Sequence, residues 1–254
     1  MSFIQPQARY RLNVDPRLSA NQLAEYLEAT ATRRKSIVRE ARFPKAAVVT
    51  QLKEARTSIA KLLTHPAVAG ETLVAAAERC VSRESGVGAT DWVRQDCKAS
   101  LEAIDAFHLA QSSNVLGLGQ FTFRPLASSP PLLEISGVGV SVNLAATVHR
   151  TSKGEQHIGG VMLYLGRPEG SAKIRKERGV TAALLTYLFC QAFLAELGKP
   201  DPALCFLLDV FGKAIIPAPA RHKRLLGEVH LACEEIVLRW QTIDPPTDYD
   251  GPPP

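Results

Sequence analysis

The 254-residue chain contains no long uninterrupted apolar run and no signal-peptide pattern. Its longest apolar stretch, residues 181–197, is interrupted by Thr186, Tyr187 and Gln191, whereas a membrane helix needs about 18 or more consecutive apolar residues. The first ten residues lack the basic and then apolar segments of a secretory signal. We therefore expect a soluble, cytoplasmic protein that makes no contact with a membrane.

Paired cysteine motifs are also missing. The chain has five cysteines, an odd number, at positions 80, 97, 190, 205 and 233, and none forms a C-x-x-C pair. A disulfide framework or a zinc knuckle requires closer, paired spacing. The spacing therefore predicts buried free thiols, which are typical of a reducing compartment.

Several catalytic signatures do not occur in the sequence. There is no G-x-x-x-x-G-K-[ST] loop, no G-x-S-x-G elbow and no H-E-x-x-H pair, so P-loop, α/β-hydrolase and zincin chemistry have no support. His149 and His157 would face each other across a predicted hairpin, but a metal site needs a third ligand. We interpret them as surface histidines and expect no metal or cofactor.

The N-terminal half has helical periodicity. Ser19 and Gln22 have the spacing of a capping box, which predicts a helix start. Arg34 would interrupt the apolar stripe of one continuous helix, and burial of an unpaired arginine is unfavourable. We therefore predict a break near Thr30–Thr32 and a second helix that ends at Pro44. Three further helices are expected over residues 48–65, 71–83 and 90–108.

From Leu132 the apolar period changes to two, which predicts strands. A strand over 138–149, which either continues or restarts through Thr147-Val-His149, and its partner over 158–165 would form a hairpin with a turn at Lys153-Gly154. A helix over 180–197, a buried strand over 204–210 and a helix over 222–240 follow, with a basic loop over 167–179. The fold class is thus α/β (α+β), a helical half followed by a small mixed sheet of β-β-α-β-α order flanked by helices.

Composition shifts suggest where the chain divides. Glycine, serine and proline accumulate after the helical half, and the C-terminal end is acidic and proline-rich, as is typical of disordered tails. The expected parts are a helical region over 1–112, a connecting segment over 113–131, an α/β core over 132–243 and a disordered tail over 244–254.

Two resemblances follow from this pattern. The β-β-α-β-α order resembles the core of PD-(D/E)XK nucleases. Over nearly its whole length the chain also resembles an uncharacterised bacterial protein family, with matching segments at Leu23-Ala-Glu-Tyr-Leu27, Arg33-Arg34, Phe43-Pro44, Ile135-Ser-Gly-Val138, Ser141-Val-Asn143, Gly159-Gly-Val-Met-Leu-Tyr-Leu165, Ala232-Cys-Glu-Glu-Ile236 and Trp240. The second resemblance implies no activity.

The nuclease resemblance implies a metal site that the expected strands do not provide. Such an enzyme holds a divalent metal with carboxylates from two core strands, beside a lysine. Residues 138–149 contain no acid, and 158–165 contain neither an acid nor a lysine. Weak alternative ligands are Glu134, Asn143 and Asp209. We favour a different role for Asp209, as an acid that caps the Phe211–Lys213 turn, and expect that cleavage activity has been lost.

Basic residues form three clusters in a chain whose net charge is +5 and whose pI is about 9.0. Such clusters can neutralise nucleic-acid phosphates, or can be no more than the solvated faces of helices. The candidate nucleic-acid-binding residues are Lys35, Arg39, Arg42, Lys173, Arg175, Lys176, Arg178, Arg221, Lys223 and Arg224.

Three functional hypotheses remain open. In order of preference, they are a non-catalytic DNA- or RNA-associated or scaffolding subunit of a bacterial multi-protein system, a protein–protein adaptor, and a metal-dependent nuclease with migrated ligands. Mobile-element or phage defence is the setting that the resemblance suggests for the first. Protein partners or a homo-oligomer fit the first two.

Overall fold

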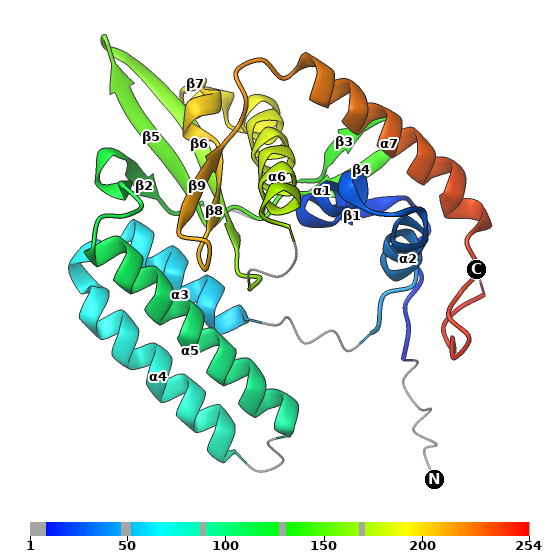
Figure 1. The fold of residues 1–254 in the computed structure, drawn as a ribbon, viewed down its shortest axis with the longest axis horizontal. Helices are drawn as coiled ribbons and strands as arrows, with labels where there is room; N and C mark the ends of the chain where they lie inside the picture. Colours follow the sequence, from blue (N-terminus) through cyan, green and yellow to red (C-terminus); the bar gives the residue numbers. More distant parts are fainter. Residues whose placement is uncertain (1–8, 47–51, 87–89, 127–130, 168–170, 254) are drawn as a thin grey trace. The chain divides into compact units, whose positions relative to one another are not determined.

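The computed structural model describes residues 9–46, 52–86, 90–126, 131–167 and 171–253. They form an α/β protein, with helices in the first half and a mixed sheet after it (Figure 1), which confirms the expected fold class. Within these residues, no helix has both the length and the apolar character that crossing a membrane requires.

The chain builds two compact units, which differ from the expected parts. Unit 1 comprises residues 1–49, 131–141 and 223–254, and unit 2 comprises residues 50–130 and 142–222. The chain therefore leaves unit 1 and returns to it twice. The expected division at 113–131 does not separate these units, because local composition does not show which distant segments pack together.

Within its described residues, unit 1 contains a three-stranded sheet and three helices. Strand β4 is central, parallel to β1 and antiparallel to β3, and helix α7 packs against α1, α2 and β4. The elements are β1 (Arg17–Ser19), α1 (Ala20–Glu28), α2 (Ala31–Arg42), β3 (Leu133–Ile135), β4 (Val138–Ser141) and α7 (Lys223–Thr242). Helix α7, expected in the same core as the hairpin, thus belongs to this unit.

The predicted starts of the first two helices are confirmed. Ser19 caps α1 and forms a reciprocal capping box with Gln22, and Thr30 caps α2 after a break. Arg34 remains half-exposed, and its guanidinium Nε and Nη2 donate to the carbonyl oxygens of Tyr26 and Leu27, each at 3.0 Å. The break therefore lets Arg34 satisfy the end of α1, where four carbonyl groups lack helical partners.

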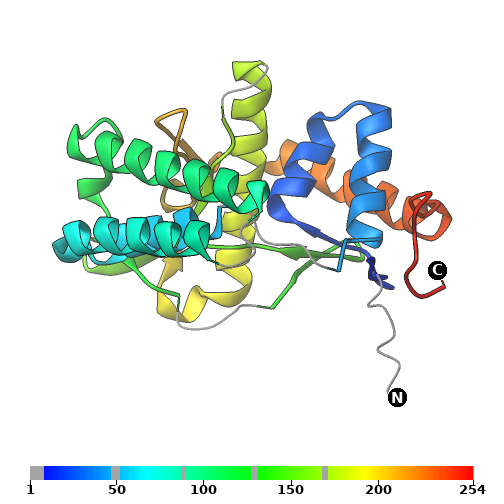
Figure 2. The same cartoon turned by 90° about the horizontal axis from the view of Figure 1, so that it is seen from below.

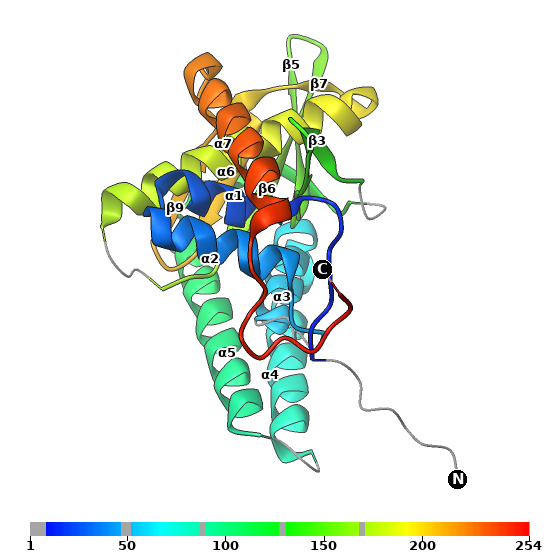
Figure 3. The same cartoon turned by 90° about the vertical axis from the view of Figure 1, so that its right-hand side faces the viewer.

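The C-terminal segment is ordered, in contrast to the expected disordered tail. Asp250 accepts hydrogen bonds from the backbone nitrogens of Arg9 (2.8 Å) and Tyr10 (3.2 Å). The ring of Tyr249 lies edge-on to Phe43, with 4.9 Å between centroids. Figure 3 shows this segment beside the chain that precedes β1. The proline-rich composition predicted disorder. The prediction was wrong because the residues that order this segment come from the other end of the chain, where composition does not reveal them.

In the part of unit 2 that the structure describes, helices combine with a six-stranded mixed sheet. Its helices are α3 (Lys53–Thr64), α4 (Ala69–Ser85), α5 (Asp91–Ser112) and α6 (Ala172–Phe193), with short 3₁₀ turns at Pro66–Val68, Leu118–Gln120, Ala195–Leu197 and Pro202–Leu204. Its strands are β2 (Thr122–Arg124), β5 (Ala146–Ser152), β6 (Glu155–Tyr164), β7 (Lys199–Pro200), β8 (Phe206–Asp209) and β9 (Ala214–Pro217). The expected start of α5 near residue 90 is confirmed, with the Thr90 side chain as its cap, whereas the expected start near Val48 lies outside the described residues.

The sheet runs β2-β5-β6-β8-β9, with β7 also paired to β6. The predicted hairpin is confirmed as β5 and β6, with left-handed backbone at Lys153 and Gly154. Of the two possibilities for its first strand, the structure shows a restart: residues 138–141 form β4 in unit 1, and pairing in unit 2 begins at Ala146. An alternating apolar pattern cannot distinguish one bent strand from two strands of different sheets.

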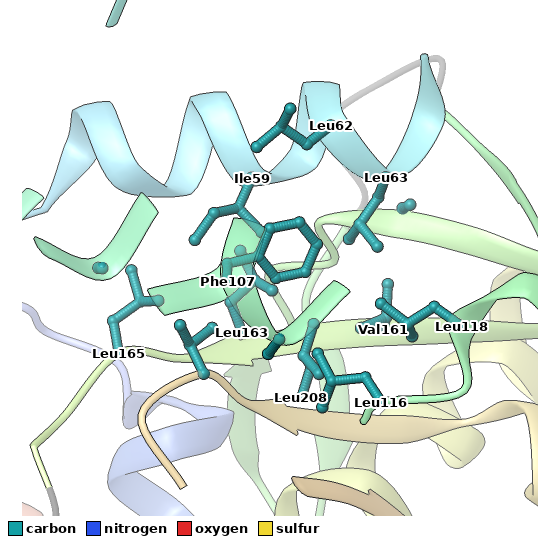
Figure 4. Close-up of a cluster of buried hydrophobic side chains, with 14 of the residues drawn as sticks. Ile59, Leu62, Leu63, Phe107, Leu116, Leu118, Val161, Leu163, Leu165 and Leu208 are labelled. Carbon is teal, nitrogen blue, oxygen red and sulfur yellow. The ribbon is translucent and has the colours of Figure 1, made fainter. Parts of the chain in front are cut away.

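Helices cover both faces of the unit 2 sheet. One face packs against α3 and α5 through a cluster that includes Ile59, Phe107, Val161 and Leu163 (Figure 4). The other face packs against α6, and a Cβ on Gly160 would lie 3.1 Å from the Thr186 side chain of that helix. Helices α3, α4 and α5 lie side by side (Figure 2). The fold is therefore a three-layer arrangement within this unit.

Helix α6 begins earlier than expected. It starts at Ala172, so most of the predicted loop over 167–179 forms its first two turns, while residues 168–170 lie outside the description. The prediction was wrong here because these turns are largely exposed and polar, so they lack the apolar periodicity that identifies a buried helix.

The prediction of buried free thiols is confirmed for all five cysteines. Burial raises the pKa of Cys80 and of Cys233 to about 12. Because the thiolate is the reactive form, these two thiols are inert at neutral pH.

Candidate functional site

Asp209 ends a buried strand at the point where two parallel strands finish. It pairs in register with Tyr164, the last residue of β6, and α6 connects the two strands. Because α6 runs back between two parallel strands, its N-terminal turns lie near the carboxyl ends of both. In open α/β sheets this edge is the usual place for a ligand, which makes it the candidate functional site.

An ion pair between Arg175 and Asp209 occupies this edge. The guanidinium Nε and Nη2 of Arg175 donate to the two carboxylate oxygens of Asp209. The same side chain donates to the carbonyl oxygens of Gly166 (2.7 Å) and Arg167 (2.9 Å) and lies over the Tyr164 ring. Only 13% of the Arg175 side chain and 5% of the Asp209 side chain are exposed.

These contacts assign both residues a structural role. The hydrogen bond to Asp209 raises the pKa of Arg175, so the guanidinium stays charged. Asp209 also accepts a hydrogen bond from the backbone nitrogen of Gly212 at 2.9 Å, which confirms the predicted capping of that turn. The Arg175 guanidinium is therefore engaged in hydrogen bonds within the protein, although the sequence suggested it as a phosphate contact.

A groove of about 730 Å³ lies beside this ion pair, within the range of small-molecule sites. Helix α6 and the β8–β9 segment form its walls. Its lining residues are Ala172, Arg175, Lys176, Val180, Asp209, Gly212, Ala214, Ile215, Ile216 and Pro217. Because most are apolar and the Arg175 and Asp209 charges cancel, Lys176 gives the lining one excess positive charge.

The alternative metal ligands do not form a described site. Glu134 is exposed on β3 and belongs to unit 1, whereas Asp209 belongs to unit 2. Asn143 is exposed in the segment between β4 and β5. Within the described ranges, no three His, Cys, Asp or Glu side chains are grouped so that they could hold a metal ion.

The candidate cations on α2 are Lys35, Arg39 and Arg42, and two of them mainly stabilise unit 1. Arg39 donates from Nε to the carbonyl oxygen of Asp244 at 3.0 Å, and Arg42 donates to the carbonyl oxygen of Trp240. Lys35 is exposed. Arg39 and Arg42 thus donate to carbonyl oxygens at the C-terminal end of α7, where cations are favourable. Of the three, only Lys35 extends into solvent.

The other candidate cations lie at the starts of α6 and α7. Lys173 and Lys176 are exposed near the start of α6, whereas Arg178 is half-buried. Arg221 in unit 2, and Lys223 and Arg224 in unit 1, are exposed around the start of α7. Lys173 and Arg224 each lie within 4 Å of a glutamate one turn later, contacts that contribute little when exposed.

The two hairpin histidines are not neighbours on a surface. His149 pairs in register with Ile158, and Arg150 pairs with His157; since side chains alternate across a strand, His149 and His157 point to opposite faces. His149 is buried, and its Nε2 lies 2.9 Å from the Thr147 hydroxyl, which donates to the Arg124 carbonyl oxygen. The surface interpretation was wrong for His149, which is a buried, hydrogen-bonded ring.

His149 should make stability depend on pH. Burial lowers its pKa in the folded protein, so the unfolded chain takes up the proton first as the pH falls below about 6.5. The free energy of unfolding should therefore decrease from pH 7.5 to 5.5, and His149→Gln should reduce that decrease. Urea denaturation at both pH values tests this; equal decreases in the two proteins would contradict the assignment.

Sequence reasoning missed the groove. The signal was present as the short apolar segment Ile215-Ile216-Pro217 after a buried strand, but a strand of this length has no clear periodicity. A sequence signal for the Arg175–Asp209 pair did exist. In a β-α-β unit, an acid at the end of the second strand lies near the start of the helix, and the start of this helix is rich in cations.

Comparisons with known proteins do not assign the chain to a family. No family model matches it, and none of the curated proteins is significantly similar. The nuclease resemblance therefore remains a prediction.

Proposed function

We propose that this protein is a non-catalytic subunit that associates with nucleic acid through cationic helix starts. Helices α6 and α7 carry cations but no acid in their first turns. The N-terminus of a helix favours anions, because its dipole and free N–H groups point toward them. Cations at these ends are unfavourable alone and become favourable when a phosphate lies between them and the helix end.

The start of α6 carries this proposal. Ser171 precedes the helix without a side-chain capping hydrogen bond, so the Ser171 hydroxyl does not occupy the first N–H groups. Lys173 is 82% exposed, and Lys176 follows three residues later on a neighbouring position of the helix. A backbone phosphate would accept hydrogen bonds from the N–H groups at the helix end and from both ammonium groups. Such phosphate contacts do not depend on the base sequence.

The state of Asp209 supports a binding role over cleavage. Metal-assisted phosphate cleavage requires hard oxygen ligands with free lone pairs. Both carboxylate oxygens of Asp209 are bonded to Arg175, and one also accepts from Gly212. A scaffold in a bacterial multi-protein system, with mobile-element or phage defence as its setting, fits this role, although that setting rests on the resemblance alone.

The variant Lys173→Glu/Lys176→Glu tests the proposal. With short duplex and single-stranded DNA or RNA at 50 mM salt, we expect the double variant to bind about tenfold or more weakly. On duplex DNA, the slope of log K against log salt should also become shallower by about 1.8, since each lost phosphate contact removes about 0.9. Fluorescence anisotropy over a salt series measures both quantities.

A matched charge reversal separates a local site from net charge. Lys61 and Lys98 are exposed on α3 and α5 of the same unit, so Lys61→Glu/Lys98→Glu changes the net charge equally. This control should keep most of the affinity. No binding by the unmodified protein at low salt, or an equal loss in both variants, would refute the proposed site.

An adaptor role is the second candidate, supported by an apolar stripe on α7. Leu231 and Leu238 are 67% and 76% exposed and, seven residues apart, lie on one face of the helix. Such a stripe is typical of helices that pack against another protein. Co-purification of a protein partner that Leu231→Glu/Leu238→Glu abolishes, without nucleic-acid binding, would favour this function.

A further inference from the structure

Strand β9 leaves one edge of the unit 2 sheet open. Among the described strands it pairs only with β8, at the end of the strand order. An edge strand presents unpaired backbone N–H and C=O groups, which can pair with a strand from another chain. The position of β9 therefore identifies an edge with unused hydrogen-bonding capacity.

The register shows which groups are free. The backbone nitrogen of Ala218 donates to the carbonyl oxygen of Cys205 at 2.8 Å, and Leu207 pairs with Ile216 two residues further on. In an antiparallel pair, bonded and non-bonded positions alternate. The groups of Ile216 thus face β8, whereas the N–H and C=O of Ile215 and the C=O of Pro217 face away.

The groove runs along this open edge. All four residues of β9 line it, although their side chains alternate between the faces of the sheet. Ile215 packs toward the α3–α5 side. Ile216 lies against α6 at Gly179, where an added Cβ would be only 2.4 Å from Ile216 Cδ1. A groove lined by consecutive residues from both faces must follow the backbone edge between them.

The α6 wall defines the chemistry of an occupant. Val180 and Ala172 extend the apolar surface, while the exposed ammonium of Lys176 supplies the excess positive charge. Pro217 has no N–H and ends the strand, which restricts pairing to a short segment. An occupant should therefore be short and extended, with apolar side chains and a carboxylate.

We propose that β9 and the α6 groove bind an extended peptide segment of a partner protein, which adds a strand at Ile215 and places an acidic side chain at Lys176. Backbone pairing gives such complexes their affinity, and alternate side-chain pockets give them specificity. This inference does not rest on the proposed nucleic-acid function: both use Lys176, but Lys173 does not line the groove, and the open edge of β9 plays no part in phosphate binding.

The test uses phage-displayed seven-residue peptides selected on the full chain. We expect enrichment of alternating β-branched sequences that contain Asp or Glu, and measurable binding of the most enriched synthetic peptide by calorimetry. Ile215→Pro removes the outward N–H but no bond to β8, and should weaken that peptide at least tenfold. Ile215→Ala keeps the N–H and serves as the matched control; Lys176→Gln should weaken binding about fivefold by removing an exposed charged contact.

Further outcomes separate this proposal from its alternatives. N-methylation of the peptide amide that pairs with Ile215 should abolish binding without altering the protein, which keeps the test valid if Ile215→Pro unfolds. No enrichment, or equal binding to Ile215→Pro and Ile215→Ala with both folded, would overturn the proposal. So would self-association lost in Ile215→Pro, which identifies a second copy as the occupant. Lys173→Glu should leave peptide binding unchanged, so either function can fail alone.

Discussion

Replacing Arg175 with methionine is expected to lower the free energy of unfolding by about 3–5 kcal/mol. The substitution keeps a long apolar stem but removes the only side chain among the described residues that forms an ion pair with Asp209. The buried carboxylate would retain just the hydrogen bond from Gly212, and removing one partner of a buried ion pair leaves an uncompensated charge. Urea denaturation followed by circular dichroism measures the change.

Two further variants establish the cause of that loss. Arg175→Met/Asp209→Leu removes both charges together and should recover much of the stability, because an apolar pair of similar volume can replace a buried ion pair. Lys176→Met, at the next, exposed position, should change stability by less than about 0.5 kcal/mol. A loss of under 1 kcal/mol in Arg175→Met would show that Asp209 has another partner or gains solvent.

The same ion pair connects stability with function. If Asp209 instead held a divalent ion, Arg175→Met would free its carboxylate and strengthen metal binding, and Asp209→Ala would abolish metal-stimulated cleavage of DNA or RNA. Such cleavage by the unmodified protein would refute a purely binding role. The bonding seen at Asp209 predicts no metal dependence in the unmodified protein.

Local signals in the sequence were sufficient for individual elements. The capping box at Ser19, the break near Thr30 and the glycine turn at Lys153-Gly154 each depend on residues a few positions apart. Each was therefore visible without knowledge of the tertiary fold. The turn-capping role of Asp209 was predicted for the same reason, since Gly212 is only three residues away.

Long-range packing explains what the sequence could not provide. The first turns of α6 are anchored by Asp209, 34 residues beyond Arg175, and no periodicity reports such a contact. The C-terminal segment is ordered by Arg9 and Tyr10, about 240 residues away. The groove likewise depends on which strand forms the edge of the sheet, a property of the assembled unit that no single segment encodes.

Replacing Trp240 with alanine should destabilise unit 1 by about 3–5 kcal/mol. The side chain is only 1% exposed, and its indole nitrogen donates to the carbonyl oxygens of Asn13 (3.2 Å) and Val14 (3.0 Å). The substitution creates a cavity and also removes a donor from two carbonyl groups. Hydrogen exchange followed by mass spectrometry should show faster exchange in α1, α2 and α7.

The control for this variant lies half a turn away on the same helix. Leu238→Ala removes an apolar side chain that is 76% exposed, so it should alter stability by less than about 0.5 kcal/mol. Trp92 is the second tryptophan of the chain and belongs to α5 in unit 2, so its fluorescence follows unit 2 alone in the Trp240→Ala protein. Equal losses in the two variants would contradict the role of Trp240, because exposed and buried side chains would then contribute alike to unit 1.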